Sequence, residues 1–144
     1  MSTNIEQFNA VLRDWAKNKP KEIVTKAQRK LALEALSRIV MRTPVDTGRA
    51  RGNWQVTIDM PARGEANVGD PVSAGRGVID KSPAFCTIWI TNNVPYITVL
   101  EYGLFDPENP GPNKHGQVLV SGGFSVQAPH GMVGVTLGDL RAMF

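Results

Sequence analysis

The chain has 144 residues, of which 42% are hydrophobic and 20% charged, with a formal net charge of +3. This length and composition are typical of a single globular domain and exclude a disordered or fibrous chain. No apolar run is long enough to span a bilayer, and the N-terminus lacks the basic and apolar regions of a secretory signal. We therefore expect no membrane partner and synthesis in a reducing cytoplasm.

Few residues are available for metal or redox chemistry. Cys86 is the only cysteine, and His115 and His130 are the only histidines. A single cysteine excludes an internal disulfide, and neither histidine has acidic or cysteine neighbours at ligand spacing. No serine stands in a nucleophile elbow with a histidine partner. We expect no metal, no cofactor and no enzymatic activity.

The net charge is distributed unevenly. Residues 1–51 contain 11 Lys/Arg and 5 Asp/Glu, a balance of +6, whereas residues 52–144 contain 5 and 8, a balance of −3. This asymmetry is compatible with nucleic-acid binding, with contact between copies of the chain, or with ordinary solvated helix faces. The basic residues are scattered around a helix without interleaved aromatics, which argues against specific nucleic-acid recognition.

The first predicted helix runs from Thr3 to about Lys17. Thr3 and Glu6 have the capping-box spacing that begins a helix. Its apolar side chains recur on one face, which we expect to be buried: Ile5, Phe8, Val11, Leu12 and Trp15.

The second predicted helix begins after a break at Asn18-Lys19-Pro20 and ends at Arg42, because Thr43 precedes a proline. Apolar side chains of its two halves lie on faces rotated well apart, and its middle is apolar nearly all round. A helix with this pattern touches more than one surface. One surface should be the sheet, and the other the first helix or a neighbouring subunit.

Alternating residues predict strands over 53–60 and 85–91. The segment between them, 61–84, is dense in Gly, Pro, Ala and Ser and is predicted as a long loop. A short helix should follow over 96–102, closed by Gly103.

The last third should contain a loop, a hairpin turning at Ser121-Gly122-Gly123, and alternating Val133 and Val135 before a terminal helical turn. We therefore predict an α+β fold, with two N-terminal helices packed on a small, mainly antiparallel sheet. The single domain covers residues 1–144, with a helical part (1–42), a sheet part (52–103 and 127–144), a long loop (61–84) and an inserted loop and hairpin arm (104–126).

The sequence TPVDTGRARGNW, over residues 43–54, joins the helical part to the sheet. Asp46-Thr47-Gly48 matches the tripeptide around the catalytic carboxylate of aspartic proteases, which use two carboxylates sharing a proton. The tripeptide occurs once, so only a dimeric protease would be complete. The following Arg49 and Arg51 favour an ionised carboxylate and argue against this interpretation.

The alternative interpretation of this segment is a structural elbow. Pro44 ends the helix, Asp46 or Thr47 accepts hydrogen bonds from nearby backbone, and Gly48 adopts a left-handed conformation. Arg49 and Arg51 then remain exposed on a rigid corner, where acidic groups of another chain could meet them.

Three separated segments together resemble one family: 42–49 with 51–54; 90–96 with 100–103, which reads Leu-Glu-Tyr-Gly; and 127–133, which reads Gln-Ala-Pro-His-Gly-Met-Val. In this order and spacing they resemble the neck or tail-completion proteins of long-tailed double-stranded DNA bacteriophages. The resemblance covers most of the chain from Arg42 onward.

The resemblance implies a non-enzymatic virion protein of the head–tail junction, made in the host bacterial cytoplasm. Such proteins form rings, usually six-fold or twelve-fold, around a channel that passes DNA. The implied partners are further copies of the chain and other neck and tail proteins (head-closure or stopper protein, tail terminator, tail tube), with non-specific contact to translocating DNA left open. A tail-terminator hexamer that caps the tube is the alternative within the same resemblance.

This sequence departs from the family pattern at residues 104–126, because relatives pass quickly from the Glu-Tyr-Gly segment to the Gln-Ala-Pro segment. We interpret the insertion as an arm reaching a neighbouring ring. The candidate subunit-interface residues are Asp46, Thr47, Gly48, Arg49, Arg51, Trp54, Asn92, Tyr96, Glu101, Tyr102, Gly103 and Phe124.

Overall fold

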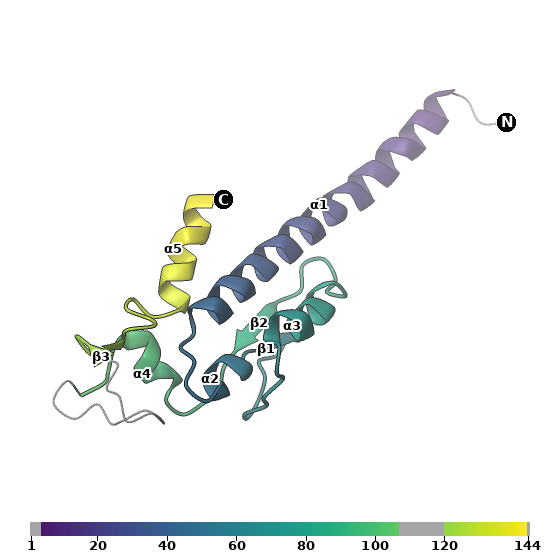
Figure 1. The fold of residues 1–144 in the computed structure, drawn as a ribbon. Helices are drawn as coiled ribbons and strands as arrows, with labels where there is room; N and C mark the ends of the chain where they lie inside the picture. Colours follow the sequence, from purple (N-terminus) through teal and green to yellow (C-terminus); the bar gives the residue numbers. More distant parts are fainter. Residues whose placement is uncertain (1–3, 107–119, 144) are drawn as a thin grey trace.

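The computed structural model describes residues 4–106 and 120–143, which form a long helix, four shorter helices and two small sheets (Figure 1). In chain order the elements are α1 (Asn4–Arg42), α2 (Arg49–Gly52), β1 (Gln55–Ile58), α3 (Pro71–Ile79), β2 (Ile88–Thr91), α4 (Ile97–Tyr102), β3 (Val120–Ser121), β4 (Phe124–Ser125) and α5 (Val133–Met143). Strands β1 and β2 pair antiparallel, as do β3 and β4. The predicted α+β class with small antiparallel sheets is confirmed.

The prediction of two N-terminal helices is wrong, since α1 is continuous from Asn4 to Arg42 with Pro20 inside it. At 1.5 Å per residue it is about 58 Å long. Pro20 has no N–H and cannot bond the Ala16 carbonyl. Ala16 and Pro20 are both exposed, so water can solvate the freed carbonyl and the helix continues. The predicted end before Thr43-Pro44 is confirmed.

The core lies between the C-terminal half of α1 and the elements beneath it. Leu36 is fully buried and contributes to one cluster with residues from α2, α3, α4 and the start of α5. Figure 1 shows α3 and the β1–β2 sheet on one side of this half of α1 and α5 beside it, while the N-terminal half projects away from the body. The buried apolar members of the cluster are Ala32, Leu36, Ile39, Val40, Ala50, Trp54, Ile79, Leu100, Ala128 and Met132.

The segment predicted as a long loop, 61–84, contains helix α3. Asp70 caps it by accepting a hydrogen bond from the Ser73 N–H at 3.2 Å, and Pro71 occupies its first turn. Gly75 is buried against α1 and β1, and a Cβ there would collide with Leu36. The glycine that lowers the helix propensity of this segment is therefore what allows α3 to pack closely.

The strands are shorter than predicted. β1 covers 55–58 and β2 covers 88–91, and beyond them Asp59 and Phe85 adopt positive φ angles of 66° and 61°. The Asp59 N–H still donates to the Thr87 carbonyl at 2.7 Å. Pairing therefore continues for one more bond before the chains leave the sheet.

The C-terminal third confirms two predictions and corrects one. Gly103 closes α4 in the left-handed conformation, and the β3–β4 hairpin turns at Gly122 and Gly123. The alternation of Val133 and Val135 belongs to helix α5 and not to a strand. Of the predicted inserted arm, residues 107–119 lie outside the described residues.

Candidate subunit-interface site

Thr43 is the centre of the elbow that joins α1 to the sheet. Its side chain is fully buried, and its hydroxyl donates to the Ile39 carbonyl at 2.7 Å. The same oxygen accepts a hydrogen bond from the indole Nε1–H of buried Trp54 at 2.8 Å. Trp54 is therefore a core residue that fixes the elbow to the end of α1, and its side chain is not available to a partner.

The Asp-Thr-Gly tripeptide forms the outer turn of the elbow. Gly48 has φ 83°, as predicted for an elbow glycine, and the Thr47 hydroxyl oxygen accepts from the Arg49 N–H at 3.3 Å. Asp46 is exposed. The shared proton of an aspartic-protease pair needs a sheltered pair of carboxylates, and an exposed turn supplies no such shelter within one copy.

Arg49 is held within the chain. Its guanidinium donates to both carboxylate oxygens of Glu65, at 3.0 and 2.6 Å, and lies 5.6 Å from the centre of the Tyr96 ring. The hydrogen bond that Arg49 donates to Glu65 raises the pKa of Arg49 above its ordinary value, while partial burial raises the pKa of Tyr96. This cluster connects the elbow to the segments around Glu65 and Tyr96.

Arg51 also has partners within the chain. Its Nε and Nη2 donate to the Thr43 carbonyl at 3.1 and 2.8 Å, and Nη2 also donates to the Met41 carbonyl at 3.3 Å. Met41 lies in the last turn of α1 and Thr43 directly follows it, so both carbonyls are at the helix end, where intrahelical donors are missing. The expectation that Arg49 and Arg51 are left without partners in their own chain is therefore wrong, because Glu65 and the end of α1 bind them. Their contact with acidic groups of another chain stays a prediction.

The second resemblance segment connects neighbouring elements. Asn92 donates to the Ala50 carbonyl at 2.7 Å and accepts from the Val94 N–H at 3.1 Å. Glu101 accepts three backbone N–H groups at the start of α5: Met132 at 2.8 Å, Val133 at 2.9 Å and Gly134 at 2.8 Å. A carboxylate in this position satisfies otherwise unpaired donors and complements the helix dipole, which explains why α5 begins there.

The third resemblance segment returns to the first. The Gln127 amide accepts from the Val45 N–H at 2.9 Å and donates to the Val45 carbonyl at 3.2 Å. Gly131 approaches Glu101 so closely that a Cβ would collide with the Glu101 carbonyl oxygen. The three segments that carry the family resemblance are thus joined to one another, and most of the candidate interface residues stabilise the body of the protomer.

Two candidate residues lie at the α4–β4 end of the molecule. The Phe124 ring occupies the space beside Gly103, where a Cβ would collide with it, so Phe124 packs internally. Tyr102, in contrast, is 68% exposed, and Leu104 is 63% exposed. With Val126, which is also exposed, these side chains form what we call the end patch.

The projecting half of α1 carries a row of exposed apolar side chains. Phe8 is 62% exposed and Trp15 is 56% exposed. The predicted burial of this face is wrong, because the continuous helix carries it past the body (Figure 1). We call its members the stripe: Ile5, Phe8, Val11, Leu12 and Trp15.

The stripe does not lie on the side of α1 that faces the body. At about 100° per residue, its centre is rotated about 100° around the helix from Leu36 and Ile39, which face the core. The described side chains from Ile5 to Ile23 are all exposed. A neighbour placed beside the helix could cover the stripe without displacing anything in the body.

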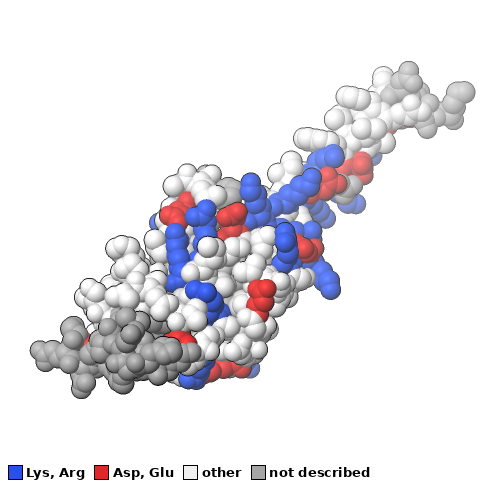
Figure 2. All heavy atoms as spheres, viewed as in Figure 1, with Lys and Arg blue, Asp and Glu red and all other residues white. Residues whose placement is uncertain are grey.

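Charge also distinguishes α1 from the rest of the molecule. It contains nine Lys/Arg and four Asp/Glu, a balance of +5. Figure 2 shows Lys and Arg gathered along the middle of α1, with mostly uncharged atoms nearer its N-terminal tip. At its C-terminal end, Arg38 and Arg42 both pair with Asp139 of α5, and the hydrogen bond from Arg42 lowers the pKa of Asp139.

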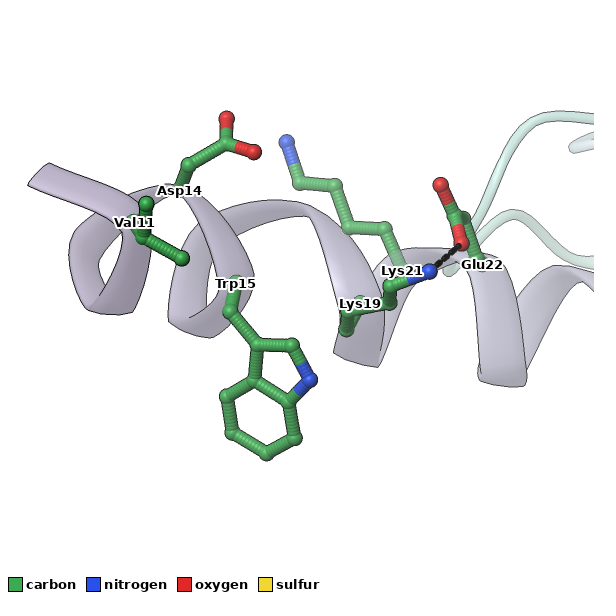
Figure 3. Close-up of a pocket in the computed structure, with 6 residues that line it drawn as sticks. All are labelled: Val11, Asp14, Trp15, Lys19, Lys21 and Glu22. Carbon is green, nitrogen blue, oxygen red and sulfur yellow. Dashed lines mark hydrogen bonds and ion pairs between the residues drawn. The ribbon is translucent and has the colours of Figure 1, made fainter. Parts of the chain in front are cut away.

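An open hollow of about 500 Å³ lies on the same half of α1 (Figure 3). All its lining residues come from this one helix: Val11, Asp14, Trp15, Lys19, Lys21 and Glu22. The Trp15 indole points to the opposite side of the helix from Asp14 and Lys21, and Lys19 pairs with Glu22 at 3.3 Å. The hollow has no opposing wall, which fits a contact surface better than a small-molecule site.

Within residues 4–106 and 120–143, no three His, Cys, Asp or Glu side chains gather where they could hold a metal ion. None of the described helices is both long and apolar enough to cross a membrane. Comparison with protein-family models, with curated proteins and with solved structures gives no match for this chain.

Proposed function

We propose that this protein is a structural component of the neck of a long-tailed double-stranded DNA bacteriophage. In this role it forms a ring that completes the tail and joins it to the portal and connector of the capsid. The observation that carries the proposal is the projecting half of α1, whose apolar stripe has no cover within the described protomer. A contiguous apolar face of this kind marks a protein-binding surface.

The packing of the resemblance segments supports the same proposal. The segments at 42–54, 90–103 and 127–133 are joined by Asn92, Glu101 and Gln127 into one body. They resemble neck proteins in sequence, and they build a scaffold that presents α1 to other chains. The partners that this role implies are copies of the same chain, the head-closure protein, the tail terminator and the tail tube.

The experiment that tests the proposal is electron microscopy of virions in which this chain carries a visible label. The label should lie at the head–tail junction, in a ring with six-fold or twelve-fold repetition. Label on the capsid shell or at the tail tip would reject the proposal. A hexamer at the very end of the tail tube would instead assign the tail-terminator role.

A further inference from the structure

We propose that the stripe on α1 of one copy packs on the end patch of the next copy, in a head-to-tail contact. The stripe comprises Ile5, Phe8, Val11, Leu12 and Trp15, and the end patch comprises Tyr102, Leu104 and Val126. The inference rests on the proposed function in one respect, that a ring needs a repeating contact between its copies.

The two surfaces lie at opposite ends of the molecule (Figure 1). The segments of the end patch lie together, because the Phe105 N–H donates to the Gly123 carbonyl at 3.1 Å and Phe124 packs beside Gly103. A contact between different surfaces at opposite ends is heterologous, and it repeats until the rotation closes it into a ring. A two-fold contact would use the same surface on both copies.

Charge favours this pairing over a pair of α1 helices. Beyond Trp15 the stripe face continues into Lys19, Lys26 and Lys30. If two α1 helices paired in parallel, these lysines would face the same lysines of the partner. If they paired antiparallel, the lysines would face the partner's apolar stripe. The described residues around the end patch have the opposite sign, since 92–106 and 120–131 contain two Asp/Glu and no Lys or Arg, a balance of −2. A helix face that continues into lysines is complementary to an acidic end, whereas two such faces repel each other.

The size of the stripe predicts a weak single contact. Five partly exposed apolar side chains bring on the order of 500 Å² from one partner, below the ~800 Å² per partner of a typical stable interface. Two isolated copies should therefore associate weakly. In a closed ring every copy uses both of its surfaces, so the assembly is held more firmly than any pair.

The test is cross-linking in full-length chains that carry C86S and one new cysteine. A short bismaleimide should join L12C chains to V126C chains when the two are mixed, and should join neither variant to itself. A10C, which lies on the opposite side of the helix from Leu12, replaces L12C in the control mixture and should give little product. Efficient L12C self-coupling would overturn the proposal in favour of helix pairing, and absence of product in the L12C–V126C mixture would also overturn it.

Sedimentation gives a second measurement, with matched charges. L12E should weaken self-association at least about tenfold, because it places a charge at the centre of the stripe, whereas A10E should leave it nearly unchanged. Equal effects of L12E and A10E would overturn the contact. If virion label stays at the junction while cross-linking fails, this contact alone is wrong; if cross-links form and the label lies elsewhere, the proposed function is wrong.

Discussion

The Glu101 carboxylate accepts hydrogen bonds from three backbone N–H groups, so replacing Glu101 tests whether it caps the N-terminus of α5. Changing Glu101 to Ala leaves the N–H groups of 132, 133 and 134 without this acceptor and should lower the free energy of unfolding by about 2 kcal/mol. The measurement is urea unfolding followed by circular dichroism. Glu22→Ala removes an exposed carboxylate paired with Lys19 and should change stability by less than about 0.5 kcal/mol. Equal losses in both variants would contradict the capping role.

Asp139 should make the free energy of unfolding depend on pH in the acidic range. Its pKa is lowered in the folded protein by the hydrogen bond from Arg42, so its contribution is present above the ordinary Asp value of about 4. That contribution is lost as the pH falls through the lower folded pKa, because protonation then removes the charge that the arginines stabilise. Asp139→Asn should reduce this slope when stability is measured from pH 6 to pH 2. An unchanged slope would mean that other carboxylates dominate acid unfolding.

Residues with local roles could be predicted from sequence, and residues with distant partners could not. Pro44, Gly48 and Gly103 act through backbone conformation, which depends on residue type alone. Arg49 was expected to have no partner in its own chain, but it binds Glu65, which lies 16 residues away in a segment without a periodic apolar pattern. Sequence shows that an arginine is available and does not show whether its own chain engages it.

Helix α3 contains two glycines, one packed and one open to solvent, so substituting each separates the effect of packing on stability from the effect of helix propensity. Gly75 faces Leu36 and Val56, whereas nothing lies within 4 Å of a Cβ at Gly77. Gly75→Ala should destabilise the protein by about 1–3 kcal/mol through overpacking. Gly77→Ala should stabilise it by about 0.5–1 kcal/mol, because Ala is the better helix former. Thermal unfolding measures both, and destabilisation by Gly77→Ala would contradict the assigned helix.

The elements that were predicted wrongly share a physical cause. α3 was missed because its Gly and Pro content reads as loop, although Asp70-Pro71 was an available start signal. α5 was expected to begin as a strand, because the alternation of Val133 and Val135 gave no sign that Glu101 would cap a helix there. Pro20 was expected to break α1, but its turn lies in solvent. In each case the setting in the fold outweighed local preference.

For the whole molecule, the projecting half of α1 should contribute little to the stability of one copy. Removing residues 1–17 should change the free energy of unfolding by less than about 0.5 kcal/mol, because the described side chains there are exposed. Leu36→Ala, in the buried half of the same helix, should cost about 2–5 kcal/mol. Chemical denaturation of both variants provides the comparison. A large loss on truncation would show that the arm packs on its own body.

The uncovered half of α1 also affects how easily the isolated chain is cleaved by proteases. A helix without tertiary packing is only marginally stable in water, so it opens often. Arg13, Lys17 and Lys21 lie in this half and offer cleavage points to proteases that cleave after basic residues. A cleaved copy would keep its end patch and lose its stripe. It could still bind the stripe of one neighbour, but it could not bind the end patch of the next. In the proposed ring, such cleaved copies would inhibit closure, so proteolysis before assembly would lower the yield of complete rings.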